Sequence, residues 1–234
     1  MEFFDHLDEL RRRLIRALIW ASFGVAVSWN LAPTVIHLLT DPMQGQVNWI
    51  WRNIYDGFMQ YVKISLVGGL IAFAPLILYE AWAFVAPALT PPEKKFVWVT
   101  LPFSVLLFFL GVAMCYACIP LFAKFFLPYF AMWGLEDAKP SIDAAAYVGF
   151  LMLCFLAFGM CFQIPLVVIF LAKLGLVDYK FLALYRRHAW FIICVIASIV
   201  TPTWDPVTMM ACALPVCLLY EMSVLIVRFF IKPL

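Results

Sequence analysis

Long apolar runs alternate with short polar segments along almost the whole of this 234-residue chain. A helix needs roughly 20 apolar residues to cross a lipid bilayer. Four runs reach that length and predict membrane-spanning helices: residues 14–32, 58–79, 96–119 and 144–174.

Prolines and glycines set the expected ends and bends of these helices. We expect the first helix to end at Pro33 and the third to stop at Pro120, because proline interrupts the helical hydrogen-bond ladder. Gly68, Gly69 and Pro75 in the second run predict a kinked rather than a broken helix. The excess length of the fourth run, which holds Gln163 and Pro165 near its middle, predicts a tilt or a kink there. The polar and aromatic segments 33–57 and 122–143 are predicted to be loops at the membrane surface.

The last two runs differ from the first four. Residues 187–201 hold fewer apolar residues than a typical span requires, and residues 207–227 follow after the turn "TPTWDP". They predict a helical hairpin with a short first arm, suited to a locally thinned bilayer. A re-entrant hairpin that does not cross remains the alternative.

Composition and charge indicate the class of protein to which this pattern belongs. Hydrophobic residues make up 66% of the chain and charged residues 13%, which is typical of an all-α integral membrane protein. We interpret residues 1–234 as one membrane domain with six spans. With six spans, twelve of the 16 Lys and Arg residues fall on one side, which places both termini in the cytoplasm. These twelve are Arg11, Arg12, Arg13, Arg16, Lys94, Lys95, Lys173, Lys180, Arg186, Arg187, Arg228 and Lys232.

Motifs for catalysis, nucleotides and metals do not occur in the sequence. It has no G-x-x-x-x-G-K-[ST], no H-E-x-x-H and no G-x-S-x-G, so we expect neither an enzyme nor a cofactor. The seven cysteines lie in or beside apolar runs and are interpreted as small core residues, including the C-x-x-C of Cys115 and Cys118. A net charge of +2 gives no indication of a nucleic-acid partner. The first 30 residues lack the pattern of a removable signal peptide.

Polar side chains at membrane depth are costly and therefore candidate functional residues. Gln163 fits either contact with a guest polypeptide or a hydrogen bond between helices. Glu221, two turns before Arg228, fits either a functional acid or a carboxylate paired with a neighbouring helix. Glu80 is expected at the interface, and Asp205 is expected to bind backbone amides in its turn.

The stretch "HLDELRRRL", residues 6–14, places acids among arginines directly before the first apolar run. On a helix, side chains three and four positions apart are neighbours, so His6, Glu9, Leu10 and Arg13 share one face. A solvated amphipathic lead-in explains the arginines, which hold the terminus inside. It leaves the abundance of acids unexplained, because orientation needs only positive charge.

These stretches together resemble the TatC family, the membrane-embedded core of the twin-arginine protein translocase. "HLDELRRRL" is similar to the family's pattern H-L-x-E-L-R-x-R-L, and "APLILYEAWAFVAPALTPPEKK" to its second signature. "AFGMCFQIPL", "TPTWDPV" and "LPVCLLYE" follow in the family's order, so the resemblance covers essentially the whole chain.

The resemblance implies a fold and a function. The implied fold has six transmembrane helices, cytoplasmic termini, short fifth and sixth helices and a cupped, glove-like shape. The implied function is binding of twin-arginine signal peptides and export of folded proteins across a bacterial-type cytoplasmic (inner) membrane. The implied partners are TatA-type and TatB-type single-span subunits in an oligomeric complex, with energy from the proton-motive force.

Site residues are carried over from the same resemblance. Glu9 and Glu93 would receive the arginines of the signal, because a guanidinium presents a planar fork of donors to carboxylates. Phe84 would lie in the same surface region, and the apolar part of the signal along the concave face towards Gln163. The further signal-binding positions are His6, Leu10, Arg11 and Arg13. The two arginines would hold the acids and the loop in position, or repel misplaced signals, rather than bind the signal directly. Structural or partner contacts are expected at Pro42, Pro75, Tyr116 and Asp205.

Three departures from the family pattern and one rival class remain. Gln163 stands where the family often has glutamate, Thr90 where an aromatic residue is familiar, and "TPTWDP" replaces a more compact "TPPD". A small secondary transporter or channel for a solute is the alternative function, which predicts inverted repeats and several intramembrane charges. An intramembrane hydrolase would need a nucleophile or a metal constellation, which the sequence does not offer.

Overall fold

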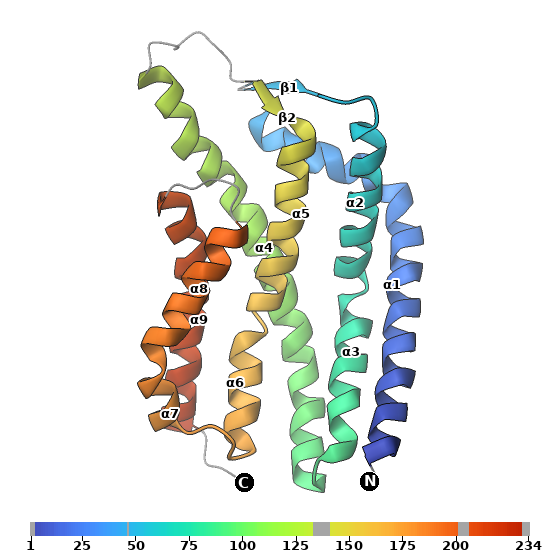
Figure 1. Cartoon of the computed structure of the whole chain (residues 1–234), viewed down its shortest axis with the longest axis vertical. Coiled ribbons are helices and arrows are strands. Elements are labelled where there is room, and N and C mark those ends of the chain that lie inside the picture. Colours follow the sequence, from blue (N-terminus) through green and yellow to red (C-terminus); the bar gives the residue numbers. More distant parts are fainter. Residues whose placement is uncertain (1–2, 46, 133–140, 201–205, 231–234) are drawn as a thin grey trace.

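A computed structural model describes residues 3–45, 47–132, 141–200 and 206–230 of the chain. The described residues are almost entirely helical (Figure 1). The α-helices are α1 (Phe3–Thr40), α2 (Asp56–Ala72), α3 (Ala74–Val85), α4 (Pro91–Met132), α5 (Ala144–Cys161), α6 (Ile164–Lys173), α7 (Tyr179–Leu184), α8 (Arg186–Val200) and α9 (Pro206–Phe230). Two 3-10 turns, η1 (Asp41–Met43) and η2 (Ala86–Ala88), and two short strands, β1 (Asn48–Ile50) and β2 (Ser141–Asp143), complete the described elements.

Up to five units among the described residues are long and apolar enough to cross a membrane. Four described stretches are long and apolar enough as they stand: Leu7–Met43, Pro91–Pro120, Ala144–Lys173 and Cys212–Phe229. The bent pair α2 and α3 adds a fifth. Helix α8 has only 15 residues, about 22 Å at 1.5 Å per residue, against a hydrocarbon core of about 30 Å. In Figure 1 the α8–α9 hairpin ends well below the upper ends of α4 and α5, as the prediction of a short hairpin requires.

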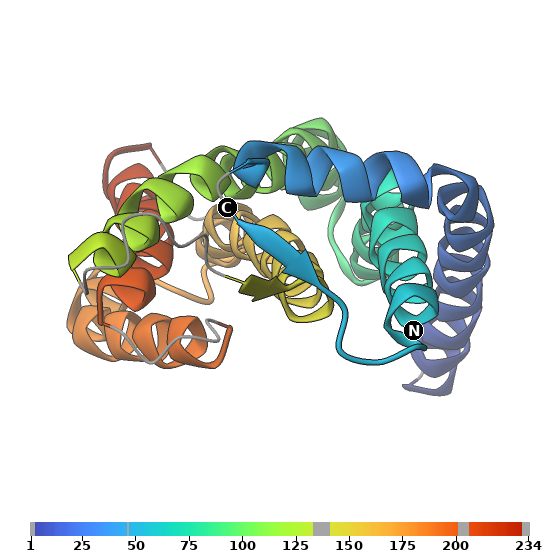
Figure 2. The ribbon, with the colours of Figure 1, turned by 90° about the horizontal axis from the view of Figure 1, so that it is seen from above.

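Two predicted helix ends are wrong. Helix α1 continues through Pro33 to Thr40, and its last turns bend to lie across the end of the bundle (Figure 2). Helix α4 continues through Pro120 to Met132. A proline inside a helix removes one backbone hydrogen bond, but the helix goes on beyond it when the following residues remain helix-forming and find packing partners.

Both predicted positions are irregular, but the helix is broken there and not only kinked. The second span bends by 58° between α2 and α3 at Phe73, and Pro75 occupies the first turn of α3, where proline is tolerated. The fourth span breaks between α5 and α6 at Phe162 and Gln163, and Pro165 again lies in the first turn that follows. In both spans a proline therefore lies in the first turn of the helix that follows the break.

The two segments predicted as surface loops contain a small sheet. Strands β1 and β2 pair in parallel, with Trp49 opposite Ile142. Arg52, shortly after β1, forms an ion pair at 3.2 Å with Asp143, the last residue of β2. The Asp143 carboxylate also accepts a hydrogen bond from the Ala145 amide at 2.9 Å, which caps α5. These contacts tie the segment before α2 to the start of α5.

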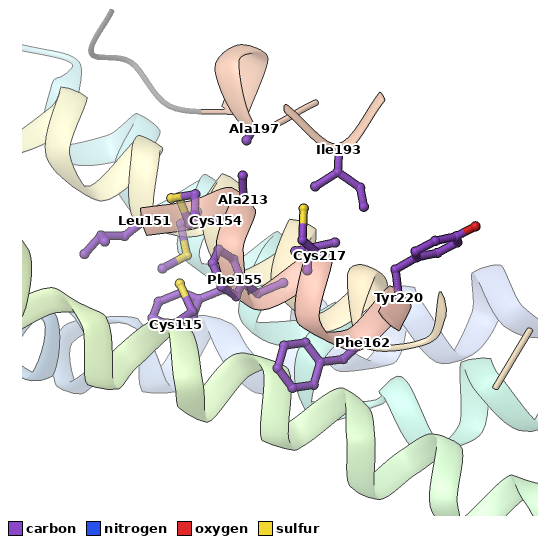
Figure 3. Packing of buried hydrophobic residues seen from close by; sticks show 14 of the residues in the cluster. Cys115, Leu151, Cys154, Phe155, Phe162, Ile193, Ala197, Ala213, Cys217 and Tyr220 are labelled. Atoms are coloured by element: carbon purple, nitrogen blue, oxygen red, sulfur yellow. The ribbon is translucent and has the colours of Figure 1, made fainter. Parts of the chain in front are cut away.

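The main core runs from α1 and α2 through α4 and α5 to α8 and α9. Figure 3 shows Cys115, Cys154 and Phe155 packed together near Ala213, with Ile193 and Cys217 further along the same interface. All seven cysteines are free thiols, and four of them are fully buried. This agrees with the interpretation of cysteine as a small core residue.

Seen along the bundle, the helices form an arc rather than a closed ring (Figure 2). Helix α1 stands at one end of the arc and the α7–α9 segment at the other, with α4 along the outer side. The concave side is open, which is the cupped shape expected from the resemblance.

Candidate functional site

The charged residues that the sequence singled out gather at one end of the bundle. Figure 1 places the start of α1, the end of α3 and the start of α4 at the same end. We call this the charged end. Among its acids are Glu9 on α1, Glu80 on α3 and Glu93 on α4.

Arg13 joins the first two of these acids. Its Nε donates to Glu9 Oε1 at 2.7 Å, one helical turn earlier on α1, and its Nη1 donates to Glu80 Oε2 on α3 at 2.9 Å. One guanidinium therefore links two helices through charge-assisted hydrogen bonds. Of the acids that Arg13 was expected to hold, it pairs with Glu9, and among the described residues its second partner is Glu80 and not Glu93.

Glu80 does not lie where the sequence predicted it. It is only 5% exposed, whereas we expected an interfacial side chain. A buried carboxylate is costly unless a cation and hydrogen bonds compensate it, and Arg13 supplies both. A signal for this was present in the sequence: Glu80 continues the helix between the apolar run before it and the aromatic residues Trp82 and Phe84 after it.

A groove runs beside the charged side chains of Glu9, Arg13 and Glu80, which we call the ion triad. It has a volume of about 280 Å³ between α1 and α3. Its lining residues are Leu10, Arg13, Leu14, Ala17, Ile77, Glu80, Ala81 and Phe84. Three predicted site residues, Leu10, Arg13 and Phe84, thus share one groove, and Glu80 adds a carboxylate that the prediction had not assigned to it.

Glu93 has a local structural role at the start of α4. Its Oε2 accepts a hydrogen bond from the Thr90 amide at 2.7 Å, which is half of a capping box T-x-x-E around Pro91 and Pro92. Among the described residues, no hydrogen bond or ion pair joins Glu93 to Glu9. The two acids thus lie at the same end of the bundle without touching. Arg11 is exposed, and His6 lies on α1 with its side chain outside the description.

Gln163 forms hydrogen bonds between helices. Its Oε1 accepts from Ser104 Oγ at 2.5 Å, and its Nε2 donates to the Ser104 carbonyl at 3.0 Å. Trp82 Nε1 donates to the same Ser104 hydroxyl at 3.1 Å, so the network joins α3, α4 and the break before α6. Of the two roles left open for Gln163, the structure displays the interhelical one.

Glu221 is also paired with a neighbouring helix. Arg186 Nε lies 3.0 Å from Glu221 Oε1, and Trp190 Nε1 donates to the same oxygen at 3.1 Å, which joins α8 to α9. Arg228 instead places its guanidinium over the Tyr179 ring, 5.2 Å from the centroid. Glu221 therefore holds the short hairpin together.

Replacing Glu221 tests that role. We expect Glu221→Ala to lower the free energy of unfolding by about 1 kcal/mol, a modest figure because the pair is partly exposed to solvent. Glu221→Gln keeps an acceptor for Trp190 and should lose about half as much. The measurement is detergent-induced unfolding of the purified protein. Equal losses in the two variants would contradict the hydrogen-bond part of this account.

The remaining predicted contact residues lie near the bent end of α1. Tyr116 Oη on α4 points to the Leu38 carbonyl at 3.5 Å, and Pro42 lies in η1, directly after α1. Tyr147 on α5 donates to the Leu39 carbonyl at 3.0 Å, a contact that the sequence did not predict. Asp205 lies outside the described residues. Among those described, no three His, Cys, Asp or Glu side chains are grouped to hold a metal ion.

Comparison with known proteins identifies the family to which this fold belongs. The described helices form an open arc of apolar helices, with a mostly apolar groove and the Arg13–Glu80 ion pair at one end, which defines a polytopic α-helical membrane protein. The family model "Sec-independent protein translocase protein (TatC)" matches residues 5–215. The chain belongs to the TatC family.

Individual relatives agree over their full lengths. The chain is 32% identical to the TatC protein of Carboxydothermus hydrogenoformans over 100% of this chain and 95% of that protein. It is 34% identical to the TatC protein of Aquifex aeolicus over 96% of this chain and 93% of that protein. A crystal structure titled "Twin Arginine Translocase Receptor- TatC" superposes with a TM-score of 0.86 at 33% identity, over 95% of this chain and 98% of that one. The predicted six-helix fold is thereby confirmed.

Proposed function

We propose that this protein is the signal-peptide receptor of a twin-arginine translocase. It binds signals with two adjacent arginines at the charged end and exports folded proteins with TatA-type and TatB-type subunits, using the proton-motive force. Its supporting observation is the match of nearly the whole chain to a family of protein-transport subunits and to a structure titled as the receptor. The acids at the charged end supply negative charge that complements the two arginines of such a signal.

In this proposal, Glu9 and Glu93 are the carboxylates that receive the signal. Glu9 uses one oxygen for Arg13 and has a second oxygen to offer. Glu93 likewise uses Oε2 for the Thr90 amide, and each carboxylate can accept further hydrogen bonds. Leu10 and Phe84 line the groove beside Glu9 and form an apolar wall for the peptide.

The proposal also sets the orientation and the location. The charged end faces the cytoplasm, because twelve of the 16 Lys and Arg residues are on that side of a six-span chain. Both termini are then cytoplasmic, in the cytoplasmic membrane of a bacterial-type cell. One chain forms an open arc and not a pore, so the passage for folded cargo requires the partner subunits or further copies in an oligomeric complex.

Site-specific photo-crosslinking tests the receptor role. A signal peptide with two arginines is compared with its twin-lysine version, in membranes that contain wild type, Glu9→Gln or Glu93→Gln. We expect crosslinks at the charged end with the arginine signal, and a reduction of at least about tenfold in each variant, since a charge-assisted hydrogen bond is worth about 1.5–3 kcal/mol.

The choice of glutamine separates binding from folding. Glutamine at position 93 keeps an acceptor for the Thr90 amide, so the capping box survives while the charge is lost. Asp178→Asn is the matched control, because Asp178 is an exposed acid that caps nothing, just before α7. Equal crosslinking by the lysine signal, or no loss in both glutamate variants, would refute the receptor role.

A further inference from the structure

The Arg13 guanidinium occupies a position that suits a ligand arginine. It bridges carboxylates on two different helices with two different nitrogens, Nε at 2.7 Å from Glu9 and Nη1 at 2.9 Å from Glu80. A guanidinium holds these donors in a fixed planar arrangement, which the compact ammonium of lysine does not reproduce. The receptor site therefore already contains the chemical group that it is proposed to bind.

Charge and burial mean that the position of Arg13 requires a cation. Two carboxylates and one guanidinium leave the triad one negative charge in excess. The Glu80 side chain is 6% exposed, against 21% for Glu9, so Glu80 depends most on a compensating cation. Among the described residues, Arg13 is the one cation paired with either acid.

The groove offers a second guanidinium a way to the same carboxylate. It has Glu80 and Arg13 in its lining, next to the apolar side chains of Leu10, Ile77 and Phe84. An arginine carries a charged head on an apolar stem, so its stem can lie on such walls while its head meets a carboxylate. A peptide arginine entering here would reach Glu80 in the place of Arg13.

We propose that Arg13 holds the place of one signal-peptide arginine in the free protein, and that the incoming arginine takes over Glu80 while Arg13 swings away. This inference rests on the proposed receptor function and describes how its site is regulated. The exchange replaces one guanidinium with another, so a cation compensates the Glu80 carboxylate before and after it. It also favours arginine over lysine, because only the guanidinium reproduces the contacts of the residue that it displaces.

A double-mutant cycle on peptide binding tests the exchange. The probe is a fluorescently labelled synthetic signal peptide with two arginines, titrated against the full-length protein in lipid nanodiscs. The proteins are wild type, Arg13→Ala, Glu80→Gln and the double variant. We expect Arg13→Ala to bind about tenfold more tightly, because the guest no longer competes with a resident guanidinium. In the double variant this gain should disappear, since it depends on the Glu80 carboxylate.

A conservative variant covers the case in which Arg13→Ala does not fold. Arg13→Lys keeps the charge but loses the fork, and it should show a smaller gain that Glu80→Gln again removes. Size-exclusion profiles and the peptide-induced shift in Tm report folding separately from affinity. Unchanged or weaker binding by folded Arg13 variants, or the same gain without the Glu80 carboxylate, would overturn the exchange.

Failure of the inference and failure of the receptor function give different results. If only the exchange is wrong, wild type still prefers the arginine peptide over its twin-lysine version and Glu93→Gln still weakens binding, while the Arg13 variants show no gain. If the receptor function itself is wrong, wild type does not distinguish the two peptides and Glu93→Gln has no effect. The second result overturns both proposals.

Discussion

Gly69→Leu is expected to lower the free energy of unfolding by about 3 kcal/mol or more, and Gly69→Ala by about 1–3 kcal/mol. The reason is the close approach of α1 and α2. A Cβ at Gly69 would lie 2.5 Å from the backbone carbon of Gly24 and from the nitrogen of Val25. Those atoms belong to a helix backbone, so the two helices would have to separate. Small residues permit such approach between membrane helices, where packing provides much of the association energy.

A glycine on the same helix is the matched control. Gly57, in the first turn of α2, would have no atom within 4 Å of an added Cβ. Gly57→Ala should therefore be neutral or stabilising by up to about 1 kcal/mol, because alanine favours the helix. The measurement is unfolding of the purified protein in mixed micelles by titration with a denaturing detergent. A Gly69→Ala protein as stable as Gly57→Ala would show that α1 and α2 do not pack through these glycines.

The second large effect is expected at Gln163. Gln163→Leu should lower the free energy of unfolding by about 2 kcal/mol, because it removes the acceptor of the Ser104 hydroxyl and a donor to the Ser104 carbonyl. Ser104 is completely buried, so water does not replace these partners. Single hydrogen bonds between membrane helices average about 0.6 kcal/mol and reach about 1.7 kcal/mol, so the loss of two accounts for an estimate of about 2 kcal/mol.

Gln163→Glu is the informative companion. A neutral carboxyl offers one acceptor and one donor, the pair that the amide uses here, so the loss should stay below about 1 kcal/mol. The same mixed-micelle titration compares the two variants. Equal losses in Gln163→Leu and Gln163→Glu would mean that Gln163 contributes through its size and not through its hydrogen bonds.

Local chemistry explains which helix breaks were predictable. Pro75 and Pro165 each begin a new helix, because proline is tolerated in the first turn and excluded from the interior hydrogen-bond ladder. The same rule failed for Pro33 and Pro120, through which α1 and α4 continue. The difference depends on what packs beyond the proline. For α1 it includes the hydrogen bond from Tyr147, which lies more than a hundred residues away in sequence.

Sequence motifs likewise predicted only some of the contacts in the site, and the others follow from the tertiary structure. The capping box at Thr90 and Glu93 is a local pattern, and the pair Glu9 and Arg13 follows from helical spacing. Glu80 was misplaced, because its burial results from α1 packing against α3 and its partner Arg13 lies 67 positions away. Spacing along one helix carries no information on such a pairing.

What the sequence determined by itself is the class of protein and the family: the apolar runs require a membrane, the distribution of Lys and Arg indicates an orientation, and the ordered motifs indicate TatC. Hydropathy and local motifs act over one helix or less, which is why a single sequence is enough to read them. Only the tertiary structure decided which polar groups meet: Arg13 with Glu80, Gln163 with Ser104, and Glu221 with Arg186. Buried polar groups must find partners, but the choice of partner follows from how the helices pack.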